Sequence, residues 1–255
     1  MISIDFDKFH LGRKVKYFSE APSMKSGIFD SYIHSYCLVP RFGFIRTPGF
    51  TKFIYLKERK FEEDFTRTTL FHIKRAYSEG VRCSTTNDMG MYISFFKSYL
   101  ERKNLTNFIP EVQLKALGDS LVMRAAYQRE GQILTFHSYI LDKSVKRVRL
   151  LHSFSDLHVN GLGKDEKSLI GRANKLLHYD DMLFFREQGF EVYDFGGYAF
   201  NTCDKSLQGI NCFKDNFGGI LVEESDYESF IILAAKILKE FSHFIHERFP
   251  GNRKL

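Results

Sequence analysis

The sequence predicts an α+β fold in which a mixed, mostly antiparallel sheet is flanked by helices. Two observations carry this prediction. Three strand-like runs follow one another with short turns between them, at 120–128, 132–141 and 146–155. A long amphipathic helix, one short strand and a further helix come after them. Consecutive strands favour an antiparallel meander, so this order differs from the regular alternation of a doubly wound sheet.

The chain before the meander is predicted to contain strands and two helices. Aromatic and β-branched residues at 29–56, interrupted by turn signals, predict two or three strands. Apolar residues recur at helical spacing over 61–77, and Gly80 ends this helix. A short strand is predicted at 80–85 and a second helix at 89–103.

The chain after the meander begins with a long helix, predicted at 170–188 and stopped by Gly189. A short strand at 192–195 then leads into a pair of glycines. Another strand pair is expected around 210–222, and apolar residues at helical spacing predict a final helix at 226–249. We expect a smaller N-terminal α/β lobe over 1–115 and the larger core over 116–255, packed together because no linker separates them.

Composition limits the classes of protein to consider. The chain has 255 residues, of which 44% are hydrophobic and 27% charged, as in ordinary globular domains. No apolar run approaches the length of a membrane span, and the first residues carry acid where a signal peptide carries base. We therefore expect a cytoplasmic protein without membrane insertion.

The ionic and metal-binding residues give weaker indications. The net charge of +6 favours an anionic partner such as a nucleotide or a phosphorylated cofactor, without choosing among them. The dense basic run at 143–149 alternates like one solvated face of a strand. The four cysteines are scattered, and the pairs His34/Cys37 and His243/His246 lack a second ligand pair, so no metal site is predicted.

The turn Gly171-Arg172-Ala173 at the predicted helix start carries the main chemical hypothesis. A helix that begins there presents unpaired N–H groups and the positive end of its dipole, which together bind phosphate. We therefore expect the amides of Ile170 to Asn174 to hold the diphosphate of a carrier. The upstream turn Gly161-Leu162-Gly163 offers an alternative position.

The same turn resembles the phosphate loop of the GNAT acyltransferases, although Ser168 stands at the leading position where that family has Gln or Arg. Three further stretches resemble the Fem-type peptidoglycan aminoacyltransferases, a branch of the same superfamily: 73–81, 193–197 and 209–219. The resemblance implies a GNAT-like fold and the transfer of an acyl group to an amine.

The resemblance leaves several donors and acceptors open. The chain is shorter than Fem-type enzymes that use aminoacyl-tRNA, which favours shorter relatives that take an acyl group from acyl-CoA. The first hypothesis is therefore an N-acyltransferase acting on a nucleotide-linked amino sugar for lipopolysaccharide or another cell-surface polysaccharide. The alternatives are a Fem-type aminoacyl-tRNA-dependent transferase acting on a peptidoglycan precursor, and a non-catalytic basic module that binds nucleic acid. The oligomeric state is left open.

Four residues are candidates for catalysis. His152 is proposed to take a proton from the acceptor amine, although strand alternation also allows a hydrogen-bonded core position. Asp194 is proposed to orient the amine, or alternatively to cap the glycine turn that follows it. Lys214 resembles a family lysine that stabilises charge in the transition state, with binding of acceptor phosphates or a surface position as alternatives. Tyr193 is expected to donate to the leaving group or acceptor, or simply to pack.

The remaining site residues are assigned by the GNAT-like arrangement that the resemblance implies. The acyl-CoA cosubstrate is expected to contact one end of the third meander strand and the start of the long helix, through Leu151, Ser153, Phe154, Ile170, Gly171, Arg172, Ala173 and Asn174. The acceptor is expected to contact Arg41, Arg46, Phe195, Gly196, Gly197 and Phe213, with Lys52 as a further cation for its diphosphate.

Overall fold

The computed structural model describes residues 1–5, 14–23, 25, 29–57, 60–105, 111–128, 131–155, 161–235 and 237–238. The chain forms two compact units: a smaller one made of residues 1–49 and 223–255, and a larger one made of residues 50–222. Two strands, β4 (Phe44–Tyr55) and β10 (Ile220–Ser229), run from one unit into the other. The predicted boundary between 115 and 116 falls inside the larger unit. That residues 1–115 contribute to the acceptor site stays a prediction.

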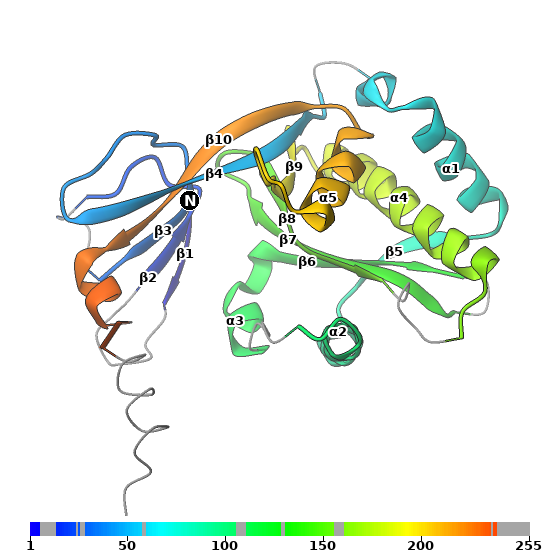
Figure 1. The fold of residues 1–255 in the computed structure, drawn as a ribbon, viewed down its shortest axis with the longest axis horizontal. Helices are drawn as coiled ribbons and strands as arrows, with labels where there is room; N and C mark the ends of the chain where they lie inside the picture. Colours follow the sequence, from blue (N-terminus) through cyan, green and yellow to red (C-terminus); the bar gives the residue numbers. More distant parts are fainter. Residues whose placement is uncertain are drawn as a thin grey trace, which may run out of the picture. The chain divides into compact units, whose positions relative to one another are not determined.

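The larger unit is built on a mixed sheet in the order β4-β9-β8-β7-β6-β5 (Figure 1). The predicted meander is confirmed, because the three central strands pair antiparallel in sequence order, followed on the outside by β5. On the other side β9 runs parallel to β8 and antiparallel to β4. The bounds are β5 (Arg82–Thr86), β6 (Leu121–Tyr127), β7 (Ile133–Asp142), β8 (Arg147–Ser155) and β9 (Val192–Gly197).

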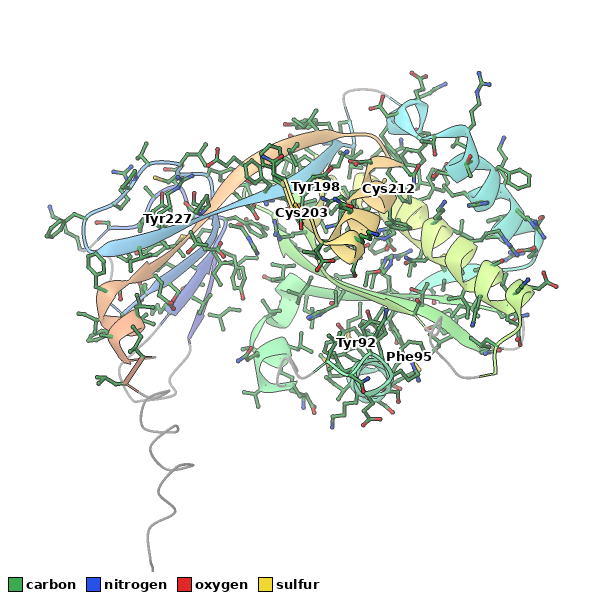
Figure 2. All side chains as sticks on the ribbon, in the orientation of Figure 1. Tyr92, Phe95, Tyr198, Cys203, Cys212 and Tyr227 are labelled. Carbon is green, nitrogen blue, oxygen red and sulfur yellow. The ribbon has the colours of Figure 1, made fainter. Side chains whose placement is uncertain are left out.

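Helices cover both faces of this sheet (Figure 1). α1 (Arg67–Ser78), preceded by the 3₁₀ turn η1 (Phe61–Asp64), and α4 (Lys164–Glu187) share a core with one face. α2 (Met89–Arg102) covers the other face, where its aromatic side chains, labelled in Figure 2, pack on the sheet. The short α3 (Glu111–Ala116) and the turn η2 (Gly118–Ser120) lead into β6. The helix predicted at 89–103 is thus confirmed to within one residue. The helix predicted at 61–77 is present but begins at Arg67, after the 3₁₀ turn.

The long helix begins earlier than predicted. α4 starts at Lys164, and the Glu166 side chain accepts a hydrogen bond from the N–H of Gly163 at 2.7 Å. The sequence from 164 to 168 is exposed, and its lysines and glutamate are good helix formers, so these residues make a solvated first turn rather than a loop. The prediction of a helix start at Ile170 is wrong, and Gly171 lies in the helix interior.

The segment after β9 also differs from the prediction. Residues predicted as part of a strand pair form α5 (Lys205–Asp215), because Asp204 caps the helix by accepting from the N–H of Ser206 at 2.7 Å. β10 then continues through the predicted start of the last helix, so residues 226–229 are a strand. Helix begins only at 230, and the predicted part from 239 onward, with His243 and His246, lies outside the described residues.

Among the described residues of the smaller unit, the strands follow one another in the order β1-β2-β3-β10-β4. β1 (Ile2–Asp5) and β2 (Lys14–Tyr17) are antiparallel, whereas β2 and β3 (Ser31–Ser35) are parallel. Tyr32, Phe44 and Tyr227 form a small core, with the first two rings edge to face at 5.5 Å between centroids. Within the described part of the chain, no helix has the length and apolar character needed to cross a bilayer.

Candidate active site

The parallel strands β8 and β9 separate partway along their length. Their paired register ends where Arg149 lies opposite Asp194, yet β8 continues to Ser155 and β9 to Gly197. On the other side β8 stays paired with β7, and its register shifts so that Leu151 is the additional residue between Leu150 and His152. The separation and this bulge together open one edge of β8 inside an otherwise continuous sheet.

Gly196 stands where the two strands separate. Its φ of 73° is left-handed, and a Cβ at this position would lie 2.9 Å from the carbonyl oxygen of Leu150. Only glycine allows both this backbone conformation and this close approach. Gly196 therefore shapes the opening between the strands, whereas a Cβ on Gly197 would meet nothing within 4 Å. The assignment of both glycines to acceptor binding stays a prediction.

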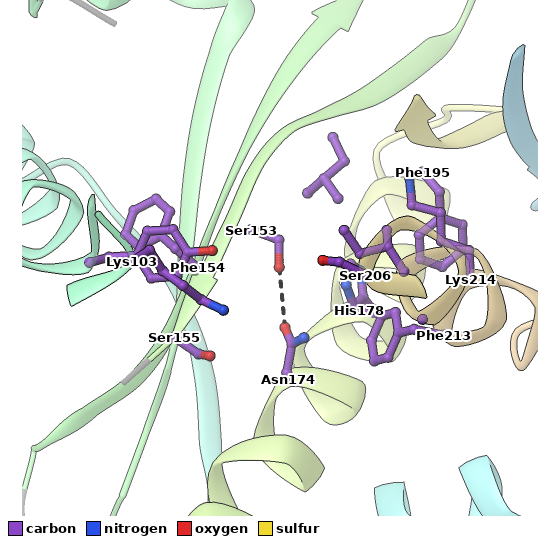
Figure 3. A pocket seen from close by; sticks show the side chains of 14 residues that line it. Lys103, Ser153, Phe154, Ser155, Asn174, His178, Phe195, Ser206, Phe213 and Lys214 are labelled. Carbon is purple, nitrogen blue, oxygen red and sulfur yellow. Dashed lines mark hydrogen bonds between the residues drawn. The ribbon is translucent and has the colours of Figure 1, made fainter. Parts of the chain in front are cut away.

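A cavity of about 390 Å³ occupies this opening (Figure 3). Its wall combines an edge of β8, the middle of α4, the end of β9 and one face of α5, with two residues from the end of α2. The lining residues are Tyr99, Lys103, Leu150, Ser153, Phe154, Ser155, Asn174, His178, Phe195, Ser206, Gly209, Ile210, Phe213 and Lys214.

A buried ion cluster closes the inner end of the opening. The Asp194 carboxylate accepts from Arg149 Nη1 at 2.8 Å, from Arg147 Nε at 2.9 Å and from the N–H of Gly196 at 2.8 Å. Burial opposes ionisation, but the guanidinium groups of Arg149 and Arg147 hold the pKa of Asp194 well below its usual range. The predicted solvated face at 143–149 is wrong for both arginines, which are buried against this carboxylate, and Asp194 does not line the cavity.

Lys214 projects from α5 into the cavity wall. Its Nζ donates to the carbonyl oxygen of Gly196 at 3.2 Å and to that of Gly197. Burial lowers the pKa of Lys214 to about 8, although the nearby Asp194 acts in the opposite direction. A largely buried cation held by two carbonyls at the mouth of the strand opening can stabilise negative charge that forms there.

A second titratable side chain, His178 of α4, lines the same cavity and was not predicted. Its Nδ1 lies 2.7 Å from the hydroxyl of Tyr193, which in turn lies 2.7 Å from the hydroxyl of Tyr139. Tyr193 is fully buried, so it reaches the cavity only through His178. Its predicted role as a direct donor to the substrate is untested.

His152 lies away from the cavity. Its Nδ1 is 2.9 Å from both the Tyr92 hydroxyl and Ser138 Oγ, and its ring packs against Phe96 of α2 at 5.0 Å. Burial lowers its pKa to about 4. The structure thus gives His152 the hydrogen-bonded core position that strand alternation allowed, while its neighbours Ser153 and Phe154 do line the cavity.

The residues expected to hold a carrier diphosphate are not brought together. Within α4 the amides of 171–174 belong to the helix interior and have no free hydrogen-bonding capacity for a phosphate. Ile170 and Ala173 are core residues, and Arg172 pairs with Glu79 at 2.8 Å. Asn174 alone among them lines the cavity, 3.4 Å from Ser153 Oγ (Figure 3).

The true start of α4 does not replace the expected phosphate site. Its first turn holds Asp165 and Glu166, and the Glu166 carboxylate already accepts the hydrogen bond that the N–H of Gly163 could give to a phosphate. A negative first turn repels an anionic ligand. Neither the predicted loop nor the upstream glycine turn therefore fits a coenzyme A diphosphate.

The predicted acceptor residues are divided between the two units. Phe195 and Phe213 line the cavity. Arg46, in the smaller unit, donates to Ser225 Oγ at 2.7 Å and pairs with Glu223, and the exposed Arg41 of the same unit lies 3.4 Å from Cys37 Sγ. Their role toward an acceptor, like that of Lys52, which pairs with Asp215, stays a prediction.

A signal for His178 and for the cavity-lining face of α5 was present in the sequence. Asn174 and His178 are four residues apart, so they share one face of any helix that contains both. Ser206, Ile210 and Phe213, spaced by four and three residues, likewise share one face of α5, part of which was predicted as a strand.

The fold is α+β and GNAT-like, as predicted. The class follows from the central sheet with its separating parallel strands and from the helices on both faces. A scan against protein-family models and a search of curated proteins gave no match.

The solved structures that share this fold include the following three. The C-terminal domain (DUF2156) of a putative lysylphosphatidylglycerol synthetase from Agrobacterium fabrum has a TM-score of 0.56 at 11% identity, over 92% of this chain and 82% of that one. The L-PGS structure from Bacillus licheniformis gives 0.56 at 11% identity, over 85% and 77%. FemX gives 0.59 at 14% identity, over 76% and 68%. At such identities the similarity establishes the fold, and the activity has to be argued from the site.

Proposed function

We propose that this protein transfers an acyl or aminoacyl group from an activated ester to an amine in the cavity between β8 and β9. The single observation that carries the proposal is the separation of the two strands beside Lys214 and His178. An acyl carbonyl that lies along the open edge of β8 reaches backbone groups at the Leu151 bulge. It also lies on the side of the cavity where Lys214 places positive charge.

The chemistry requires little more than these groups. When an amine attacks an ester carbonyl, negative charge forms on the carbonyl oxygen and the amine must lose a proton. Lys214 supplies a preorganised cation for that charge, since two glycine carbonyls hold its Nζ in place. Asp194 and its two arginines keep the strands joined just before the opening and so hold the geometry without contacting the substrate.

The aminoacyl form of the proposal has specific support. The acidic first turn of α4 disfavours a coenzyme A diphosphate at the place where the resemblance predicted it. One of the similar structures is a domain of a putative lysylphosphatidylglycerol synthetase, and another is named L-PGS. The first name indicates an aminoacyl group as the transferred unit in that protein. The acyl-CoA donor and the nucleotide-linked amino sugar acceptor rest on chain length and on the family resemblance.

A donor comparison tests the proposal. Purified protein is incubated with a nucleotide-linked amino sugar, and in parallel with a lysine-containing peptide, together with either labelled acetyl-CoA or labelled lysyl-tRNA. Label transferred to either amine supports the proposal, and ribonuclease treatment identifies the tRNA donor by abolishing only that transfer. Absence of transfer from every donor to every amine, including hydroxylamine as a small nucleophile, contradicts it.

Substitution of Lys214 tests the role given to its charge. Lys214→Met removes one stabilising donor, so we expect kcat to fall about 10²–10³-fold. The matched control is Lys205→Met, which removes an exposed lysine from the first turn of the same helix and should leave kcat unchanged. Because the pKa of Lys214 is about 8, wild-type activity should decline as pH rises through that value and the cation is lost. An unchanged kcat in Lys214→Met contradicts this role.

A further inference from the structure

A chain of buried hydrogen bonds leads from the cavity to Asp181 in α4. The Tyr139 hydroxyl donates to Asp181 Oδ2 at 2.5 Å, and the hydroxyls of Tyr139 and Tyr193 lie 2.7 Å apart. The Tyr193 oxygen lies 2.7 Å from His178 Nδ1. Each of these four side chains is no more than 1% exposed, so the chain is shielded from solvent up to the cavity wall.

The carboxylate at the far end determines the direction of every hydrogen bond in this chain. Asp181 pairs with the buried Arg124 and is an acceptor only, so the single hydroxyl hydrogen of Tyr139 goes to it. Having donated its hydrogen, the Tyr139 hydroxyl can only accept from the Tyr193 hydroxyl. Tyr193 therefore donates its single hydrogen to Tyr139 and has none left for His178. The remaining contact requires His178 to donate its Nδ1–H to the Tyr193 oxygen. The hydrogens are assigned here from this network.

The protonation state of His178 completes the assignment. Burial holds its pKa well below the ordinary value, and the neighbouring His137 and Lys214 act in the same direction. The titratable groups that face the ring are His137 and Tyr139 from β7, Tyr193 from β9 and Lys214 from α5. A neutral imidazole with its hydrogen on Nδ1 has a lone pair on Nε2.

The Nε2 atom is the part of His178 that the cavity can use. Within the described part of the chain, Nε2 makes no hydrogen bond. It is also absent from the set of buried side-chain atoms that have no partner, so the atom itself is not fully buried. This is expected of an atom that reaches the cavity, which the imidazole lines beside Phe213 and Lys214 (Figure 3).

We infer that His178 Nε2 is the general base for the proposed transfer, taking the proton of the attacking amine, an inference that rests on the proposed function. The amine nitrogen forms a bond to the carbonyl carbon while its proton moves to Nε2. The bond from that carbon to the ester oxygen or sulfur then breaks, and the leaving atom departs with the electron pair and receives the proton from Nε2. Tyr193, Tyr139 and Asp181 are positioning residues that hold the Nδ1–H tautomer.

The tautomer can be measured without any substrate. In ¹⁵N-labelled wild-type protein at pH 7, two-bond ¹H–¹⁵N correlations distinguish which ring nitrogen of each histidine carries hydrogen. The His178 signals are identified by their loss in His178→Asn. We expect a neutral ring with hydrogen on Nδ1. A ring with hydrogen on Nε2, or on both nitrogens, overturns the inference.

Kinetics separate a base from a structural residue. His178→Asn keeps an amide that can donate to Tyr193 but has no Nε2 lone pair, so we expect kcat to fall about 10²–10⁴-fold with the donor KM unchanged. Tyr193→Phe should give a smaller loss and move the His178 hydrogen toward Nε2. The control His72→Asn, in α1, should keep the wild-type rate.

The proposed transfer and the role of His178 as its general base are contradicted by different results. Wild-type protein that transfers no group from acetyl-CoA or lysyl-tRNA contradicts the proposed function, whatever the tautomer of His178. Active wild type together with a His178→Asn variant that keeps its rate overturns the general base alone.

Discussion

The two halves of β8 have different surroundings and different roles. From Arg147 to Arg149 the strand is paired with β9, and its charged side chains are buried against Asp194. From Leu150 to Ser155 it has separated from β9, and its edge lines a cavity. The buried ion cluster lies where the two strands last pair, so we infer that it holds the sheet closed there and that the opening begins beyond it.

The largest expected effect comes from breaking the closed half. Asp194→Asn removes the charge with which this carboxylate pairs the buried Arg147 and Arg149, which should reduce the free energy of unfolding by about 3–5 kcal/mol. Asp215→Asn is the control, because the Asp215 side chain, which pairs with Lys52, is 45% exposed and its loss should cost less than about 1 kcal/mol. Urea unfolding of both variants measures the difference, and equal losses would show that the cluster is not what closes the strands.

The pH dependence of that effect has a defined sign. The pKa of Asp194 is lowered in the folded protein, so its contribution is present above the unfolded pKa of about 3.9 and is lost as pH falls toward the folded value. The stability difference between wild type and Asp194→Asn should therefore shrink below about pH 4. A difference that grows on acidification contradicts the assignment.

An intermediate effect is expected at the point of separation. Gly196→Ala forces a side chain into a left-handed position 2.9 Å from the Leu150 carbonyl oxygen, and such strain costs about 1–3 kcal/mol. Relief of the clash requires the strands to move, so transfer activity should fall together with stability. Thermal unfolding and the transfer assay test this prediction. An alanine variant as stable and as active as wild type would show that Gly196 does not shape the opening between β8 and β9.

The smallest effect has the opposite sign and tests the corrected helix start. Gly171 lies inside α4 with open space around its Cα, so Gly171→Ala should stabilise the protein by about 0.5–1 kcal/mol. If this glycine instead belonged to a phosphate-binding turn, alanine would reduce donor binding. A raised melting temperature with an unchanged donor KM supports a position inside the helix, whereas a raised donor KM supports a phosphate-binding turn.

The sequence was sufficient for the elements with strong periodicity. The meander over β6, β7 and β8 and the helices α1 and α2 were predicted because short polar turns and apolar spacing are local properties. The start of α4 was misplaced because a glycine turn was given more weight than a run of charged helix formers. α5 was taken for a strand because its apolar residues line a cavity rather than a continuous core.

The site was only partly predictable, for a physical reason. Lys214, Phe195, Phe213 and Asn174 were identified and do line the cavity. His178 was missed because its importance comes from contacts with Tyr193 and Tyr139, which are far away in the sequence and meet it only in the folded sheet. Arg147 and Arg149 were misread because a buried charge is distinguished from a solvated one only by its partner.

The most direct test of the central claim is to map where the reactive end of a donor binds. Backbone amide shifts of labelled protein are followed during titration with S-acetyl pantetheine and, separately, with lysyl-adenosine. The account predicts that the largest shifts for at least one of them fall on Ser153, Asn174, Phe195 and Lys214, around the opening between β8 and β9. Shifts concentrated at the first turn of α4 or in the smaller unit, with none at the opening, would contradict it.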